Sequence, residues 1–236
     1  MSKYAILLEC DPGQTLGGSC LRDVKNLESH LIKRCNFKKE NIVCLTTNNK
    51  YGLSAQSFFI ELDDVKRKLC ENDTLVILIS GHGFQTLDTN GDEEDHNDEM
   101  INIGNRYVID DEINAHIKDI TSITGTYVVL LSDTCHSGTM FDLEYIYNDV
   151  SNTFKNRTSH TKHTIGNMLS LSACNDSQLS MCDVGDDTGF GGSLTTSVLS
   201  QGVLELLIND KKAIEAYKRI KTRLLSLNQT VLLSTN

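Results

Sequence analysis

The stretch YVVLLSDTCHSG, residues 127–138, decides how this chain is expected to fold. Residues 127–131 are apolar or aromatic and carry no charge, which is typical of a strand buried on both faces of a sheet. The run then ends abruptly in small and polar residues around Cys135. Open α/β sheets present reactive groups where a central strand ends. A cysteine placed there, between hydroxyls, an aspartate and a histidine, is a candidate nucleophile rather than a packing residue.

A second apolar run ends in the same way. Residues 74–79 read TLVILI and are followed by SGHG at 80–83. Strands and helices alternate up to this point, so the sheet is expected to be mainly parallel, with both polar clusters at its carboxyl edge. Two glycines flank His82 and would expose its imidazole to a substrate backbone. His136 is the alternative histidine, but it would point to the other side of an extended segment, so His82 is preferred.

The periodicity of apolar residues predicts one α/β domain. The predicted strands are residues 4–9, 42–46, 74–79, 107–109, 127–131, 168–173 and 230–233, and the predicted helices are 20–35, 54–70, 110–117, 194–207 and 213–227. A length of 236 residues suits one domain better than two. Within it we expect a larger catalytic portion at 1–148, an exposed polar linker at 149–165 and a smaller C-terminal portion at 166–236.

Composition narrows the partners and the compartment. The formal net charge of −10 disfavours nucleic acid and anionic membrane surfaces as partners, and favours basic ligands or cations. The eight cysteines form no Cys-x-x-Cys pair, which indicates a reduced, intracellular protein. The sequence has neither a signal-peptide core nor an apolar stretch long enough to span a membrane. We therefore expect a soluble cytoplasmic protein.

An acidic segment, DTNGDEEDHNDE at 88–99, partly imitates a calcium-binding EF-hand loop. Glu93 stands where that loop requires glycine, and no helix precedes the segment, so an EF-hand is excluded. Calcium ligation by oxygen atoms alone and a solvated run of charges both remain open. His160 and His163 have no Cys or carboxylate close in sequence, so we interpret them as surface residues rather than as a metal pair.

With SGHG at 80–83 and DTCHSG at 133–138, in that order at the ends of buried strands, the chain resembles the metacaspases. These are caspase-related cysteine peptidases of the caspase–haemoglobinase fold. Further motifs carry the resemblance along the chain: LRD at 21–23, GDEED at 91–95, IDDE at 109–112, GTMFD at 138–142, SAC at 172–174, and QT at 229–230 to Ser234. The resemblance implies a mostly parallel central sheet of about six strands with helices on both faces. Without a proline-rich N-terminal extension or a long insertion before the C-terminal portion, the sequence looks like a minimal form.

The resemblance also implies a mechanism. Cys135 would be the nucleophile and His82 the general acid and base, in a reaction that passes through an acyl-enzyme. The backbone N–H groups of Gly83 and Cys135 would form the oxyanion hole.

The family's primary specificity pocket is acidic, and it would select Arg or Lys before the cut bond. The matching positions are Cys20, Asp23, Ser80 and Asp133. Removing one partner of a desolvated charge pair costs about 2–5 kcal/mol, so such a pocket would discriminate strongly. A caspase directed to Asp would instead need basic residues there.

The family is typically activated by Ca²⁺, and its ligands match Asp98, Asp110, Asp111 and Asp142. Four carboxylates brought together repel one another unless a hard cation neutralises them. The segment 100–107 is shorter than usual in the family, which makes Asp95 an alternative to Asp98.

Lys155, Arg157 and Lys162 in the predicted linker are possible self-cleavage sites, or else ordinary solvated bases. The resemblance favours a monomer that acts on protein or peptide substrates. Two other functions stay open. One is a catalytically silent regulatory or binding module with the same fold, against which Cys135 and His82 count. The other is a caspase-fold peptidase with another primary specificity, such as Asn or Asp.

Overall fold

The computed structural model describes residues 1–48, 53–89, 91, 96–104, 106–118, 120–123, 125–157, 162–163, 167–182, 184–186 and 189–236. Its helices are α1 (Ser19–Cys35), α2 (Ala55–Lys68), α3 (Asp110–Ile117), α4 (Ser193–Ser200), α5 (Val203–Ile208) and α6 (Ala213–Leu225), with 3-10 turns η1 (Lys39–Asn41) and η2 (Ile120–Ser122). Its strands are β1 (Lys3–Cys10), β2 (Ile42–Leu45), β3 (Thr74–Gly81), β4 (Gly83–Leu87), β5 (Asn97–Ile103), β6 (Arg106–Ile109), β7 (Tyr127–Thr134), β8 (Tyr145–Asn148), β9 (Thr153–Asn156), β10 (Lys162–His163), β11 (Met168–Ser172), β12 (Val184–Asp186), β13 (Gly189–Gly191) and β14 (Leu232–Thr235).

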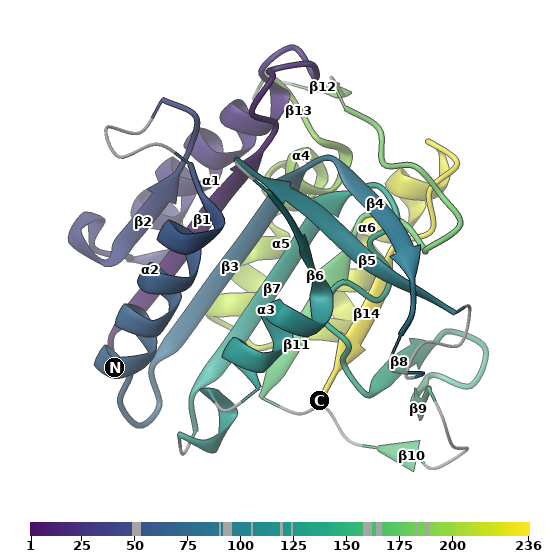
Figure 1. The fold of residues 1–236 in the computed structure, drawn as a ribbon. Coiled ribbons are helices and arrows are strands. Elements are labelled where there is room, and N and C mark those ends of the chain that lie inside the picture. Colours follow the sequence, from purple (N-terminus) through teal and green to yellow (C-terminus); the bar gives the residue numbers. More distant parts are fainter. Residues whose placement is uncertain are drawn as a thin grey trace.

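A nine-stranded sheet runs through the molecule in the order β10-β9-β8-β14-β11-β7-β3-β1-β2 (Figure 1). The five strands from β11 to β2 pair in parallel, because crossover helices connect strands that run in the same direction. The four strands β14, β8, β9 and β10 add to this parallel core in antiparallel fashion. The prediction of a mostly parallel sheet is confirmed, but its count of about six strands is too low.

Helices cover both faces of the sheet. On one face α1, α4, α5 and α6 contribute to one hydrophobic core, and on the other face α2 and α3 contribute to a second (Figure 1). The central strand β7 supplies both cores, since Val129 and Leu131 belong to the first and Val128 and Leu130 to the second. Burial on both faces explains why the run at 127–131 shows no alternation of polar and apolar residues.

A second sheet of three antiparallel strands, in the order β4-β5-β6, continues from the end of β3. Gly83, at the start of β4, pairs with Ile101 of β5. Residues 97–99, which the sequence assigned to an acidic loop, therefore lie in a strand. Both Asp98 and Glu99 are buried there. The high content of charged residues hid this strand from analysis of hydrophobic periodicity.

The segment 149–165, predicted to be an exposed irregular linker, contains two strands within its described residues. β9 pairs antiparallel with β8, and Phe154 of β9 is buried beside the ring of Tyr147 at 5.4 Å between centroids. The turn at 149–152 joins these strands as a hairpin, which the polar composition of the segment concealed. His160 lies outside the described residues.

Two further predictions in the C-terminal portion need correction. The single helix expected at 194–207 is interrupted at Gly202, whose φ of 61° is left-handed, and it becomes α4 and α5. No strand was predicted between residues 173 and 194, where the short hairpin of β12 and β13 lies. Among the helices described, none is both long and apolar enough to cross a membrane.

The burial of β7 leads to a stability prediction. Leu130 is fully buried at the middle of this strand, so Leu130→Ala should lower the free energy of unfolding by about 2–5 kcal/mol through lost burial and a new cavity. Urea unfolding followed by circular dichroism measures this change. Val150→Ala is the control, because Val150 is 94% exposed and should change stability by no more than about 0.5 kcal/mol. Equal losses in the two variants would contradict the central position of β7.

Candidate active site

The register between β3 and β7 brings the two predicted reactive residues to neighbouring positions. Gly81, the last residue of β3, pairs with Thr134, the last residue of β7. His82 and Cys135 each follow directly on this pair, at adjacent strand ends that lie about 4.8 Å apart. Both residues line one small cavity at the carboxyl edge of the sheet.

Close packing of the backbone at this edge explains why glycines flank His82. A Cβ atom on Gly83 would stand 1.9 Å from the carbonyl oxygen of Cys135, and one on Gly81 would stand 2.3 Å from the carbonyl oxygen of Cys10. Any other residue would force these strand ends apart. The structure therefore places the backbone of Gly83 against that of Cys135, where the sequence predicted a shared oxyanion hole.

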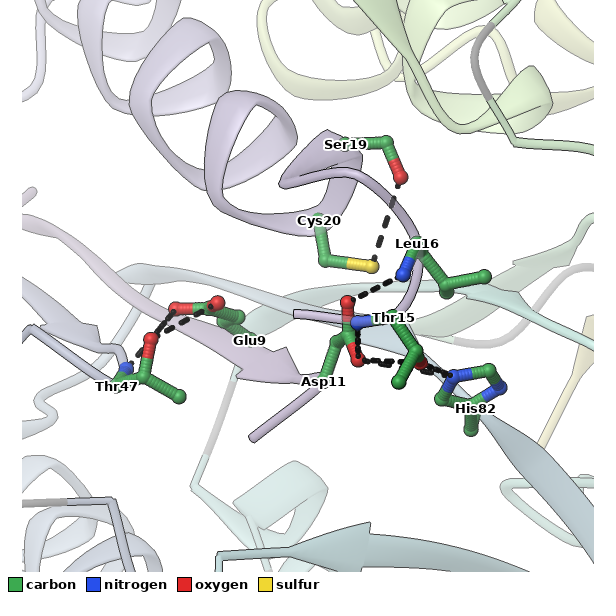
Figure 2. A network of polar contacts seen from close by, with 8 residues as sticks. All are labelled: Glu9, Asp11, Thr15, Leu16, Ser19, Cys20, Thr47 and His82. Atoms are coloured by element: carbon green, nitrogen blue, oxygen red, sulfur yellow. Dashed lines mark hydrogen bonds and ion pairs between the residues drawn. The ribbon is translucent and has the colours of Figure 1, made fainter. Parts of the chain in front are cut away.

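A polar network at the end of β1 holds the imidazole of His82 (Figure 2). Its Nε2 lies 2.6 Å from the hydroxyl oxygen of Thr15 and 3.6 Å from Oδ1 of Asp11. Asp11 is buried and accepts hydrogen bonds from the backbone N–H groups of Thr15 and Leu16, both at 2.9 Å, and from the Thr15 hydroxyl at 3.0 Å. Asp11 thus fixes the loop that carries Thr15, and Thr15 fixes one ring nitrogen of His82.

The thiol of Cys135 is half-buried and faces the segment that follows β11. Its Sγ donates a weak hydrogen bond of 3.8 Å to the carbonyl oxygen of Ser180. Burial raises the pKa of Cys135 above its ordinary value, and the negative charge of Asp133 raises it further. His136 turns away, with a φ of 50° and its Nδ1 2.5 Å from the carbonyl oxygen of Asp176. This geometry agrees with the preference for His82 over His136.

The four predicted pocket residues all line the same cavity as Cys135 and His82. Asp23 of α1 is 1% exposed, and its carboxylate accepts hydrogen bonds from the Ser80 hydroxyl at 2.7 Å and from the Gly192 N–H at 2.9 Å. Burial raises the pKa of Cys20 to about 12, so this thiol stays neutral and is a poor nucleophile near pH 7.

Asp133 of β7 supplies the second carboxylate of the cavity. It accepts hydrogen bonds from the Thr195 N–H at 2.7 Å and the Ser180 hydroxyl at 2.9 Å. Burial raises the pKa of Asp133, and burial together with the charge of Asp133 raises the pKa of Asp23. No Lys or Arg occurs among the described residues that line the cavity. A cation entering the cavity would therefore contact two carboxylates with no Lys or Arg beside them among the described lining residues.

The cavity is small in this structure. Its volume is about 40 Å³, close to the share of one water molecule in the liquid, about 30 Å³. Ser180, Met181 and Cys182, from the segment that follows β11, are among the residues that line it. A cavity of this volume is too small for a long side chain unless some of the residues that line it move.

Several residues of this site were missed by sequence reasoning. Asp11 and Thr15 lie in a loop whose conformation a sequence does not reveal, although an aspartate directly after a buried strand was an available signal. Gly191 and Gly192 come from the distant C-terminal portion and lie against the carboxylates, where a Cβ would stand 2.3 Å from Asp23 and 2.4 Å from Asp133. Two successive glycines before a helix were the only signal for this contact.

The predicted calcium ligands are divided between the small sheet with the start of α3, and a separate cavity. Asp98 and Asp110 are both buried, and Oδ2 of Asp110 accepts a hydrogen bond of 3.0 Å from the Glu99 N–H. Within the described residues, no three His, Cys, Asp or Glu side chains are arranged so that they could hold a metal ion. Asp95, the alternative to Asp98, lies outside the described residues.

Asp111 and Asp142 line a larger cavity of about 380 Å³, which is separate from the cavity at Cys135. The carboxylate of Asp142 accepts a hydrogen bond from the Asn114 side chain, and its Oδ1 lies 3.7 Å from Nη1 of Arg157. Arg157 thus supplies positive charge beside Asp142. Four carboxylates are a donor set that suits Ca²⁺, yet this arrangement would have to open for Asp142 to bind one.

Among the three possible self-cleavage residues, Lys155 and Arg157 have described side chains, and their surroundings differ. Lys155 is exposed on β9 and pairs in register with Lys162 of β10. The side chain of Arg157 is only 12% exposed because it packs beside Asp142. Lys155 is thus more accessible than Arg157.

A mainly parallel sheet that presents a cysteine and a histidine from adjacent strand ends, beside a buried acidic cavity, defines a protein of the caspase-like class. Comparison with known proteins agrees. The model of the metacaspase family, peptidase C14 domain, matches residues 3–144, and the chain therefore belongs to the metacaspase family.

Curated relatives from fungi support this assignment. The chain is 35% identical over 144 residues to metacaspase-1B of Neurospora crassa, 35% identical over 143 residues to metacaspase-1B of Aspergillus terreus, and 34% identical over 144 residues to metacaspase-1 of Ajellomyces capsulatus. These matches cover 57%, 58% and 57% of this chain but only 33%, 37% and 39% of the relatives, so the chain spans little more than a third of their length.

A solved structure shows the same fold. The crystal structure of protein GSU0716 from Geobacter sulfurreducens matches with a TM-score of 0.62 and 22% identity, over 100% of this chain and 94% of that one.

The electrostatic environment of Cys135 leads to a prediction about its reactivity. Because burial and Asp133 both raise its pKa, alkylation of Cys135 by iodoacetamide should accelerate with pH and level off only above pH 9.0, the ordinary thiol value. Asp133→Asn removes the negative charge, stabilises the thiolate and should move this inflection to lower pH. Peptide mass spectrometry of protein quenched at successive times measures both rates.

Cys135→Ser is the control that assigns the modified peptide. An inflection below pH 9.0 in the wild-type protein, or one that moves upward in Asp133→Asn, would contradict the described electrostatics of the site.

Proposed function

We propose that this chain is a cysteine endopeptidase that cleaves peptide bonds after Arg or Lys. One observation carries the proposal: Cys135 and His82 follow directly on paired residues of adjacent strands, and they share a cavity with the carboxylates of Asp23 and Asp133. The family assignment supports peptidase chemistry, and the matched residues 3–144 include Cys135 and His82.

In the proposed reaction, the sulfur of Cys135 attacks the carbonyl carbon of the scissile bond while His82 takes up the thiol proton. The N–H groups of Gly83 and Cys135 stabilise the negative charge that develops on the carbonyl oxygen. His82 then donates the proton to the departing amine, which leaves an acyl-enzyme thioester. Water, deprotonated by His82, attacks the thioester and releases the acid product and the thiol.

The surroundings of Cys135 and His82 support this order of steps. The raised pKa of Cys135 keeps it a neutral thiol near pH 7, so proton transfer to His82 accompanies the attack rather than preceding it. Thr15 engages Nε2 of His82, which leaves Nδ1 to exchange the proton with the substrate and the sulfur. Asp11 supports this orientation and stabilises the imidazolium that forms, because its carboxylate lies 3.6 Å from Nε2.

Specificity for Arg or Lys follows from the two carboxylates of the cavity. Burial raises the pKa of both carboxyl groups, and the charge of Asp133 raises that of Asp23 further. A bound guanidinium or ammonium group would offset both effects. An acidic side chain would add a third negative charge, so the alternative of cleavage after Asp is disfavoured. Cleavage after Asn remains an outcome of the test below.

We further propose that Ca²⁺ stimulates the enzyme. Asp110, Asp111 and Asp142, together with Asp98 or Asp95, would hold the ion as oxygen ligands. Binding would replace the contact of Arg157 with Asp142 and tie the start of α3 to the segment that follows Cys135. The ion would supply positive charge to this carboxylate cluster and take no part in bond breaking.

The proposed specificity predicts that the wild-type chain cleaves a fluorogenic peptide ending in Arg, and cleaves matched Asp and Asn peptides at least about a hundredfold more slowly, as expected for a desolvated charge pair. Cys135→Ala should lower kcat/KM by at least about a thousandfold because the nucleophile is gone. Initial rates of fluorescence release measure these ratios. Cys70→Ala is the matched control, because Cys70 is exposed and remote from the cavity.

Two outcomes would reject the proposal. Turnover that survives in Cys135→Ala would exclude the nucleophile. A folded wild-type chain that cleaves none of the peptides at any calcium concentration would favour the alternative of a catalytically silent module.

The calcium proposal predicts that a chelator slows peptide cleavage, and that mutation of a ligand changes the calcium concentration needed for half-maximal activity. Asp142→Asn should raise the calcium concentration needed for half-maximal activity by at least about tenfold, since affinity follows the number of charged ligands. Asp149→Asn is the control, because Asp149 also pairs with a basic residue, Lys221, but lies outside the predicted ligand set. A calcium titration of peptide cleavage measures both. Activity that is indifferent to chelators would exclude calcium stimulation.

A further inference from the structure

Two exposed aromatic rings lie immediately beyond His82, outside the acidic cavity. Phe84 is at the start of β4, two residues after His82, and the centroids of the two rings are 6.1 Å apart. Tyr107 of β6 meets Phe84 edge to face at 5.3 Å and an angle of 90°. The exposed fractions are 36% for Phe84 and 53% for Tyr107, so the rings form a surface rather than part of a core. We call Phe84 and Tyr107 the aromatic pair.

The small sheet presents the aromatic pair on one face. Phe84 pairs with Met100 of β5, and Tyr107 pairs with Asn102, two residues further along β5. Residues two apart in a strand point to the same face, so all four side chains lie on one side of the sheet. Ile101 and Val108 point to the opposite side and are fully buried there. The backbone of the small sheet therefore holds the two rings in place beside His82.

The position of the aromatic pair relative to the cut bond indicates which part of a substrate would contact it. This step rests on the proposed function. The general acid must stand beside the leaving amine, so the chain that follows the cut bond departs on the His82 side of Cys135. The cavity with Asp23 and Asp133 takes the residue before the bond. The first side chain after the bond would meet the surface that flanks His82, where the aromatic pair lies.

Exposed aromatic residues beside a reactive group are typical of recognition surfaces. Tyr and Phe give large contact areas at little cost in conformational entropy, and contiguous apolar surface is otherwise disfavoured in water. The pair is not explained as a shield for the imidazole, because more than half of Tyr107 faces solvent and the His82 side chain itself is 35% exposed.

We infer that Phe84 and Tyr107 form a subsite for the residue directly after the cut bond, and that this subsite prefers a large apolar or aromatic side chain. The bound side chain would cover the face of Phe84 and the edge of Tyr107 that water now covers. Because the subsite is an open surface rather than a pocket, its selectivity should be at the lower end for apolar contacts, about tenfold in kcat/KM.

The test uses internally quenched peptides that keep Arg before the bond and differ only in the next residue, which is Leu, Phe, Ala, Asp or Lys. With the wild-type chain at saturating Ca²⁺, the Leu and Phe peptides should exceed the Ala peptide by about tenfold in kcat/KM. In Phe84→Ala the ratio of Leu to Ala should fall to about twofold or less. Tyr107→Ala should lower the ratio by a smaller factor. Ratios within one enzyme cancel any general effect of the substitution on His82.

Leu87→Ala is the matched control. Leu87 is an apolar residue of the same strand and is 71% exposed, but it lies an odd number of residues from Phe84 and so points to the other face. Its substitution should leave the ratio of Leu to Ala unchanged. Phe84→Leu keeps an apolar side chain at this position and replaces Phe84→Ala in the test if that variant does not fold. It should retain part of the preference for the Leu peptide over the Ala peptide.

A substrate in which Arg carries a fluorescent amine directly, with no residue after the bond, separates the two proposals. If the wild-type chain cleaves neither this substrate nor any peptide, the proposed function fails, and the subsite fails with it. If the substrate is cleaved but the peptides show no preference for Leu or Phe over Ala, the subsite is wrong and the peptidase stands. A preference for Lys or Asp, or a preference that is unchanged in both Phe84→Ala and Tyr107→Ala, also overturns the subsite.

Discussion

The parallel pairing of β3 with β7 is the constraint on which the rest of the site depends. Their register ends both strands at the same level, so that the next residue of each chain segment, His82 and Cys135, leaves the sheet at the same edge. Burial on both faces holds this register, because a slip of one residue would exchange the side chains of the two cores. The geometry of the candidate site is therefore set by the packing of the core, with no need for direct contact between the two reactive side chains.

What the sequence could predict follows from the same constraint. Apolar runs locate the ends of strands, and parallel strands end at the same edge of a sheet. The sequence could therefore predict that four residues share the carboxyl edge: Ser80, His82, Asp133 and Cys135. Residues brought in by loop conformation or by a distant segment could not be found this way. Asp11 and Thr15 reach His82 through a turn, and Gly192 reaches Asp23 across 169 positions of chain. Strand β9 was missed because a short, polar strand lacks an apolar run.

The acidic cavity illustrates a general tension between stability and recognition. Two buried carboxylates destabilise the folded protein when no ligand is bound, and the charge of Asp133 raises the pKa of Asp23. Part of this cost is offset by hydrogen bonds from Ser80, Ser180, Gly192 and Thr195. Three of these four donors belong to the C-terminal portion. The C-terminal portion thus stabilises the charges of the cavity that its own residues help to line.

The order of strands at the edge of the large sheet has a consequence for the integrity of the molecule. β14, the last strand of the chain, is inserted between β8, which precedes the segment with Lys155 and Lys162, and β11, which follows it. β11 in turn pairs in parallel with β7. A backbone nick between β9 and β11 would leave the two fragments interlocked through these hydrogen-bonded ladders. Such a nicked chain would migrate as two species under denaturing conditions, yet persist in solution as a single noncovalent heterodimer.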